Sequence, residues 1–227
     1  AIGTVILPSL SRQHAGGDPK AFSATIDWAL RMVLLVGLPA ALALAILSEP
    51  LIASPFHYGK MTERDVVQAA NALEAYSLGV LTFMLIKVLA PGFFARQDLR
   101  TPVRIAVQCM VANMAFNLVL IWPLQHVGLA LSTSLSSMLN TGLLLWGLRK
   151  AGVYQPAPGW GLFALRLLAG CAAMVALVWW LNAPSAAWFA WGWQRRALEL
   201  SLLVGGGIVV YVAAMVLLGL RLRHLRH

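Results

Sequence analysis

About six stretches of this 227-residue chain are long and apolar enough to cross a lipid bilayer as helices. A transmembrane helix needs about 20 consecutive, mostly apolar residues. Turn residues and charged residues collect between the stretches. The sequence therefore predicts an all-α polytopic membrane protein, with spans near 22–47, 66–90, 103–122, 128–148, 162–181 and 197–220.

Composition supports this class, since 60% of the residues are hydrophobic and only 11% are charged. Soluble domains carry roughly 25% charged residues. The net charge of +9 is compatible with nucleic-acid binding, but the basic residues lie at the ends of the apolar stretches and form no single stripe. We therefore expect no nucleic-acid partner.

The basic residues predict the orientation of the chain, because lysine and arginine are concentrated on the cytoplasmic side of membrane proteins. Alternate connections place most of them on one side, which we expect to be cytoplasmic together with the C-terminus and a basic tail at 221–227. That side has Arg12, Lys20, Arg96, Arg100, Arg104, Arg149, Lys150, Arg221, Arg223 and Arg226, and the other side has Lys60, Arg64, Arg195 and Arg196.

Motifs for catalysis are missing from the sequence. It contains no nucleophile elbow, no zinc-protease motif and no phosphate-binding loop. Cys109 and Cys171 lie in apolar stretches without metal-type spacing, which favours buried small side chains. We predict a transporter with no catalytic residue, no metal site and no cofactor.

Lys87 is the most unusual residue of the apolar stretches. A lysine at the centre of a bilayer costs about 2.5–3.5 kcal/mol on insertion scales, so it usually faces a water-filled cavity or a partner. Its long side chain can instead reach the nearby cytoplasmic interface, because Pro91 follows within about a turn. We favour the cavity, and we expect Lys87 to face other helices.

Further polar residues within the spans are candidates for the wall of the same cavity, namely Glu74, Arg31, Asn113, Asn117 and Asn140. Each has a simpler alternative. Glu74 also fits a water-exposed upper turn, and Arg31 is spaced to pair with Asp27 four residues earlier. Amides in membrane helices commonly hold helices together.

Small residues recur in the last two spans and permit close helix contact. They are Gly170 and Ala173 in the first of these spans and Gly205, Gly206 and Gly207 in the second. A packed helix pair is the simpler interpretation, and a smooth groove for a lipid chain is the more specific one. We predict that both spans pack together and leave an apolar groove.

Residues 1–10 are apolar but too short to span a bilayer, and they show no features of a signal peptide. We interpret residues 1–11 as the end of a transmembrane helix that begins before this chain. The sequence is therefore expected to be truncated at its N-terminus.

The chain resembles the MurJ (MviN) lipid II flippases of the MOP exporter superfamily. The most specific part is Lys87-Val-Leu-Ala-Pro-Gly-Phe-Phe-Ala-Arg-Gln-Asp-Leu-Arg-Thr-Pro-Val103, supported by Gly3-Thr-Val-Ile-Leu-Pro-Ser-Leu-Ser-Arg12 and by Phe22-Ser-Ala-Thr-Ile-Asp-Trp-Ala-Leu-Arg31. Further matches are Gly128-Leu-Ala-Leu-Ser132 and the connection Tyr154-x-Pro-x-Pro-Gly-Trp160.

The resemblance implies a fold of fourteen helices, in two six-helix lobes and two extra C-terminal helices. Residues 22–148 would then supply four helices of the second lobe, and 162–220 the two extra helices with their lipid groove. It implies movement of lipid II, the undecaprenyl-pyrophosphate-linked muropeptide, from the inner to the outer leaflet of the bacterial cytoplasmic membrane by alternating access. The family's pyrophosphate-binding arginines would precede this chain, and Lys87 would belong to the remaining cavity wall.

Other functions stay open at the level of sequence. One is a related MOP-type exporter of another lipid-linked oligosaccharide or of a drug. Another is a non-transporting membrane scaffold of the cell-wall machinery. The partners implied by the resemblance are lipid II, membrane lipids and the cell-wall synthesis machinery.

Overall fold

The computed structural model describes residues 2–219, which form helices joined by short connections. Five of these helices are long and apolar enough to cross a membrane: α2, α4, α5, α6 and α8. The expected all-α membrane architecture is therefore confirmed, and the basic tail at 221–227 lies outside the described residues. The helices are α1 (Ile2–Ala15), α2 (Pro19–Ile46), α3 (Ser48–Phe56), α4 (Glu63–Phe94), α5 (Arg100–Lys150), α6 (Trp160–Leu181), α7 (Ser185–Ala190) and α8 (Trp193–Leu217).

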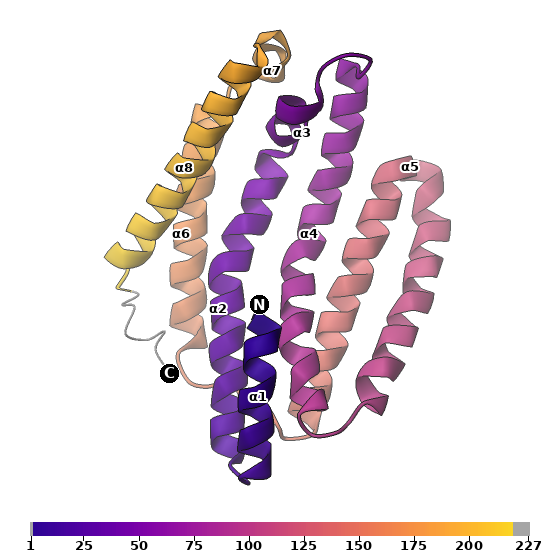
Figure 1. The fold of residues 1–227 in the computed structure, drawn as a ribbon, viewed down its shortest axis with the longest axis vertical. Coiled ribbons are helices and arrows are strands. Elements are labelled where there is room, and N and C mark those ends of the chain that lie inside the picture. Colours follow the sequence, from indigo (N-terminus) through magenta and orange to yellow (C-terminus); the bar gives the residue numbers. More distant parts are fainter. Residues whose placement is uncertain (1, 220–227) are drawn as a thin grey trace. The chain divides into compact units, whose positions relative to one another are not determined.

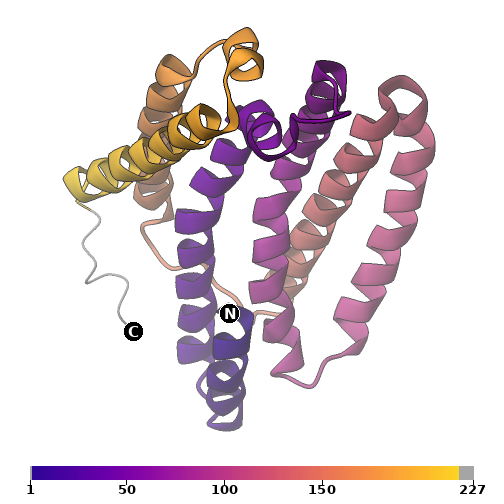
Figure 2. The same cartoon turned by 45° about the horizontal axis from the view of Figure 1, so that its top comes forward.

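The spans predicted at 103–122 and 128–148 both lie within α5, which has 51 residues. Helical geometry is interrupted at Gln125, where φ is 48° and ψ is −122°. Pro123 precedes this point and cannot supply a backbone donor. The two arms of α5 run back alongside each other (Figures 1 and 2). The two arms correspond to the two predicted spans, and the reversal lies in the gap between them.

The two arms of α5 are in direct contact. The Ser136 hydroxyl donates a 2.7 Å hydrogen bond to the Cys109 carbonyl on the opposite arm. Near the reversal, a side chain at Gly128 would collide with the Leu120 carbonyl, so only glycine permits this approach. The structure therefore contains a tight helical hairpin.

Side-chain caps fix two of the helix starts. Thr62 and Asp65 cap the start of α4 reciprocally: Asp65 Oδ2 accepts from the Thr62 backbone at 2.9 Å, and Thr62 Oγ1 accepts from the Asp65 backbone at 3.3 Å. At the start of α5, Asp98 Oδ1 accepts from the Thr101 backbone at 3.0 Å. These contacts satisfy amide groups that the first helical turn leaves without a partner.

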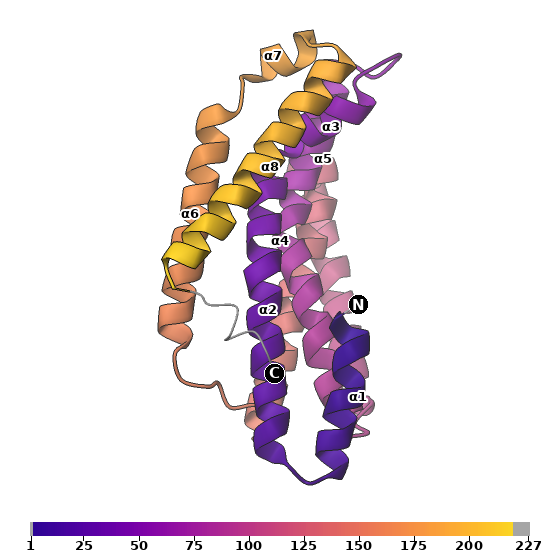
Figure 3. The ribbon, with the colours of Figure 1, turned by 60° about the vertical axis from the view of Figure 1, so that its left-hand side comes forward.

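Contacts divide the chain into two compact units. The first comprises Ala1–Gly37 and Gly79–Trp160, and in it α1 and the first part of α2 form a hairpin (Figure 3). Its buried core includes Leu10, Ile26, Val88 and Leu148. Gly79 lets α4 approach α5 closely, since a Cβ there would lie 3.1 Å from the Ser134 Cα.

The second unit comprises Leu38–Leu78 and the residues from Gly161 onward. Its core is built from Leu47, Met174, Val178, Trp188 and Leu203. The members come from the junction of α2 with α3 and from α6, α7 and α8. Burial of these apolar side chains therefore holds the short helix α7 against the long helices of its unit.

Candidate functional site

A buried carboxylate in α2 organises the connection between α5 and α6. Asp27 is 5% exposed, and its Oδ1 accepts hydrogen bonds from Tyr154 Oη at 2.9 Å and Trp160 Nε1 at 2.7 Å. The Ala157 backbone donates a third bond at 3.2 Å. Its Oδ2 lies 2.8 Å from Arg31 Nε. Several donors and a cation thus compensate the charge, as a buried carboxylate requires.

The same connection is held at two further points. Ser23 Oγ donates to the Gln155 carbonyl at 3.1 Å and accepts from the Gln155 backbone at 3.0 Å. Burial raises the pKa of the Tyr154 hydroxyl, and the Asp27 carboxylate raises it further. Tyr154 therefore remains a hydrogen-bond donor well above neutral pH. We call this set of contacts around Asp27 the Asp27 cluster.

Arg31, one of the predicted cavity residues, belongs to the Asp27 cluster. Besides the ion pair, its Nη2 donates to the Pro158 carbonyl at 3.3 Å, and its guanidinium lies 5.0 Å from the centre of the Trp160 ring. The predicted pairing of Asp27 with Arg31 is confirmed. That the α5–α6 connection is their common partner could not be predicted, because its residues lie more than a hundred positions away in the chain.

An apolar pocket of about 340 Å³ lies beside the Asp27 cluster. Leucines make up half of its lining residues, and Arg149 is its only charged residue among the described ones. Such a pocket suits a hydrocarbon chain better than a sugar, because it offers few hydrogen-bonding groups. It is lined by Leu30, Leu34, Leu85, Leu89, Thr141, Leu145, Arg149, Tyr154, Pro156 and Trp160.

Lys87 is exposed on α4, whereas the following residues Val88 and Leu89 are buried. Among the described residues it has no hydrogen bond or ion pair. The structure thus leaves its ammonium on an open face of the first unit. The expectation that Lys87 faces other helices in a cavity stays a prediction.

The remaining polar candidates do not converge on one point. Glu74 is exposed on α4, in the second unit. Asn117 donates a 3.1 Å hydrogen bond to Asn113 Oδ1 on the first arm of α5. Asn140 is half-buried on the second arm. Because Ser136 faces Cys109 across the hairpin, Asn140 lies about 12 Å along the axis from the level of Asn113.

The small residues predicted to line a groove occupy different environments. A Cβ on Gly170 would lie 2.8 Å from Met215 Sδ, and one on Gly207 would lie 3.1 Å from Val178 Cγ2. These two glycines therefore permit close contact of α6 with α8. Gly205 faces open space, Gly206 would make ordinary contact with Leu177, and Ala173 is half-buried. The pairing is present, and the lipid groove stays a prediction.

Arg196, one of the basic residues that the charge pattern assigns to the less basic side, is buried in the structure. It is 5% exposed and donates to the carbonyls of Ala53, His57 and Phe189 at 2.8–3.1 Å. Its Nη2 also lies 2.8 Å from His57 Nδ1. Arg196 therefore ties α8 to the end of α3 and to α7, whereas its neighbour Arg195 is exposed beside Trp191.

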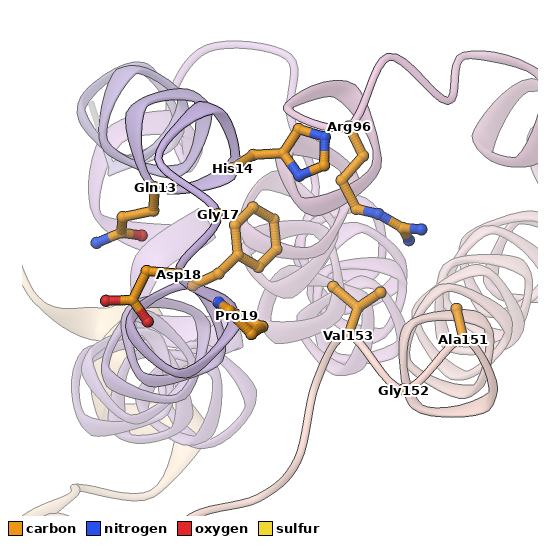
Figure 4. A pocket seen from close by; sticks show the side chains of 10 residues that line it. Gln13, His14, Gly17, Asp18, Pro19, Arg96, Ala151, Gly152 and Val153 are labelled. Atoms are coloured by element: carbon orange, nitrogen blue, oxygen red, sulfur yellow. The ribbon is translucent and has the colours of Figure 1, made fainter.

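A mixed polar pocket of about 340 Å³ lies where α1, α2, α4 and the end of α5 meet (Figure 4). His14 and Arg96 extend toward its middle, and the turn Ala151-Gly152-Val153 forms the opposite side. Asp18 contributes a carboxylate that caps α2 by accepting from the Ala21 backbone. The pocket thus combines charges of both signs and favours no single class of ligand.

Comparisons with known proteins converge on one family. The family model described as lipid II flippase MurJ matches residues 1–193. The chain is 46% identical over 227 residues to the probable lipid II flippase MurJ of Vibrio cholerae, and 40% identical over 214 residues to the lipid II flippase MurJ of Burkholderia cenocepacia. The two matches cover 100% and 94% of this chain, but only 43% and 41% of the respective relatives.

A solved structure shares the fold. It is titled lipid II flippase MurJ, inward closed conformation, and aligns with a TM-score of 0.74 at 20% identity. The alignment covers 94% of this chain and 41% of that one. The described helices therefore correspond to less than half of a larger helical protein.

Proposed function

Because the chain belongs to the lipid II flippase MurJ family, we propose that it acts as part of a flippase that moves lipid II from the inner to the outer leaflet by alternating access. The observation that carries this proposal is the 46% identity that extends over all 227 residues. The activity is stated as a proposal because the chain spans less than half the length of these relatives.

The exposed position of Lys87 supports a role in the substrate cavity. An ammonium on an apolar helix needs water or an anionic partner to remain charged in a membrane. The relatives are more than twice as long as this chain, so their further helices are available to face this side of α4. The pyrophosphate of lipid II would supply the anionic partner.

We also propose the orientation and the location of the protein. The connection between α4 and α5 carries Arg96 and leads into Arg100, and α5 ends in Arg149 and Lys150. This concentration of basic residues favours the cytoplasmic side. The protein would then be a multi-pass component of the bacterial cytoplasmic membrane.

The function is tested by replacing the native flippase of a depletion strain with this protein in the length in which the cell makes it. Lipid II on the outer leaflet is measured by an externally added enzyme that cleaves it. We expect Lys87→Glu to lose most of the cleavable lipid II and Lys87→Arg to retain most of it. Lys60→Glu changes an exposed lysine of the α3–α4 connection and should behave like the unmodified protein.

The alternatives predict other results. If the Lys87→Glu variant is expressed normally and lipid II on the outer leaflet is cleaved to the normal extent, Lys87 has no role in the substrate cavity. Restored growth without any lipid II reaching the outer leaflet would support a scaffold instead of a flippase. Export of a different lipid-linked sugar by the same protein, with lipid II unmoved, would support the related exporter.

A further inference from the structure

The α5 hairpin contains a basic pocket of about 490 Å³ at the end where the helix begins and ends. We call it the hairpin pocket. Polar residues of the first arm face the indole of Trp146 on the second. The pocket is lined by Arg100, Thr101, Arg104, Ile105, Gln108, Leu143, Trp146 and Gly147.

The polar groups of the hairpin pocket lie on one side of the first arm. Arg100, Arg104 and Gln108 are spaced by four residues, which places their side chains along one face of a helix. Among the described residues of its lining, none is acidic. Lys150 adds a third positive charge nearby, with Nζ 4.7 Å from the centre of the Trp146 ring.

Asp98 is the carboxylate nearest to this pocket in the chain, two residues before Arg100. Hydrogen bonds from the Thr101 side chain and backbone lower the pKa of Asp98, so it is ionised at neutral pH. Its single negative charge is outnumbered by the positive charges of Arg100, Arg104 and Lys150. The end of the hairpin thus keeps a net positive charge.

The surroundings of the pocket are those of a membrane interface. Between and beyond Arg100 and Arg104, the first arm exposes the apolar residues Val103, Val107 and Met110. Trp146 is 60% exposed, and tryptophan is enriched at the level of lipid headgroups. Arginine side chains can follow the helix surface to that level. The pocket therefore opens where acyl chains give way to headgroups.

Arginine binds phosphate through two parallel hydrogen bonds, and basic pockets between transmembrane helices bind anionic headgroups. Gln108 and Thr101 add neutral donors for the remaining oxygens. We propose that the hairpin pocket binds the phosphate of an anionic phospholipid of the bilayer. The ligand is a resident lipid, so this inference goes beyond the proposed transport of lipid II.

The test uses the full-length protein in nanodiscs of phosphatidylcholine with a minor fraction of phosphatidylglycerol. Native mass spectrometry after release counts the phosphatidylglycerol that remains bound. We expect the double variant Arg100→Gln/Arg104→Gln to bind phosphatidylglycerol about 10- to 30-fold more weakly, since each basic residue near the surface adds about a factor of five. Arg104→Lys keeps the charge and should lose less.

The matched control is Arg64→Gln/Arg195→Gln, which removes two exposed arginines from other helices and leaves the hairpin pocket intact. It should bind phosphatidylglycerol like the unmodified protein, and thermal unfolding checks that both double variants are folded. Equal binding by all three proteins would overturn the proposal. So would an equal loss in both double variants, because it would show attraction to overall charge instead of a site.

Discussion

At the scale of residues, two buried charges connect segments that are far apart in the chain. Asp27 joins α2 to the α5–α6 connection, and Arg196 joins α8 to α3 and α7. Burying a charge is unfavourable unless hydrogen bonds replace its water, and each of these groups has four polar partners. Each residue therefore connects its segments stably only when all of its polar partners are present.

Replacing Asp27 by asparagine should destabilise the protein by about 1.5–3 kcal/mol, because the ion pair with Arg31 and the charge-assisted hydrogen bonds are lost together. Thermal unfolding in detergent, followed by tryptophan fluorescence, measures the effect. Asp18→Asn is the matched control, since asparagine caps a helix as well as aspartate does. Equal melting temperatures of the two variants would show that the Asp27 cluster adds little stability.

The raised pKa of Tyr154 predicts an alkaline effect on stability. An unfolded tyrosine loses its proton near pH 10, whereas folded Tyr154 keeps it, so the stabilising contribution is complete below pH 10. It is lost as the pH rises further. Tyr154→Phe should remove this dependence, and melting temperatures between about pH 9 and 11 compare the two proteins. Parallel curves for both would contradict the prediction.

At the scale of elements, the positions of the long apolar helices could be predicted from the sequence, and their ends could be predicted in part. The short helices α3 and α7 lie between the predicted spans and were not predicted. Apolar length determines whether a segment spans a membrane, and the reciprocal contact of Thr62 with Asp65 depends only on neighbouring residues. The break between the predicted spans 103–122 and 128–148 places the reversal near Gln125, but its tightness could not be predicted. It depends on Gly128 meeting Leu120 across the hairpin, and no local pattern encodes that contact.

The pairing of α6 with α8 predicts opposite outcomes at two neighbouring glycines. Gly207→Val should cost about 1–3 kcal/mol, because its Cβ would press on Val178 and the helices would have to separate. Gly205→Val points into open space and should change stability by less than about 0.5 kcal/mol. The melting temperatures of the two variants, each compared with the unmodified protein, measure these losses of stability. A greater loss at Gly205 would place the contact face on the other side of α8.

At the scale of the whole molecule, the family and the fold class could be predicted from the sequence, and most of the candidate site could not. The family was predicted from the run Lys87 to Val103, and the fold class from the six apolar stretches. The site depends on which faces of the helices meet. Lys87, Glu74 and Asn140 are polar residues in apolar helices, yet nothing local to them encodes whether their faces are covered.

The proposed orientation predicts which connections are reached from outside the cell. Leu99→Cys lies in the α4–α5 connection, and Tyr58→Cys lies in the α3–α4 connection. Both positions are exposed, at 61% and 74%, and both native cysteines are buried. A membrane-impermeant maleimide should label only Tyr58→Cys in intact cells. Gln97 is a poorer position because its φ is 60°. Labelling of Leu99→Cys alone would invert the orientation.

The reversal in α5 has a consequence for biogenesis. Its tip, from Pro123 to His126, contains no lysine, arginine or acidic residue, so crossing the bilayer moves no formal charge when His126 is neutral. The two arms are in direct contact, and no extended loop separates them. The two arms should therefore leave the translocon as a single hairpin. A truncation after residue 124 should insert poorly, and extension through residue 150 should restore insertion.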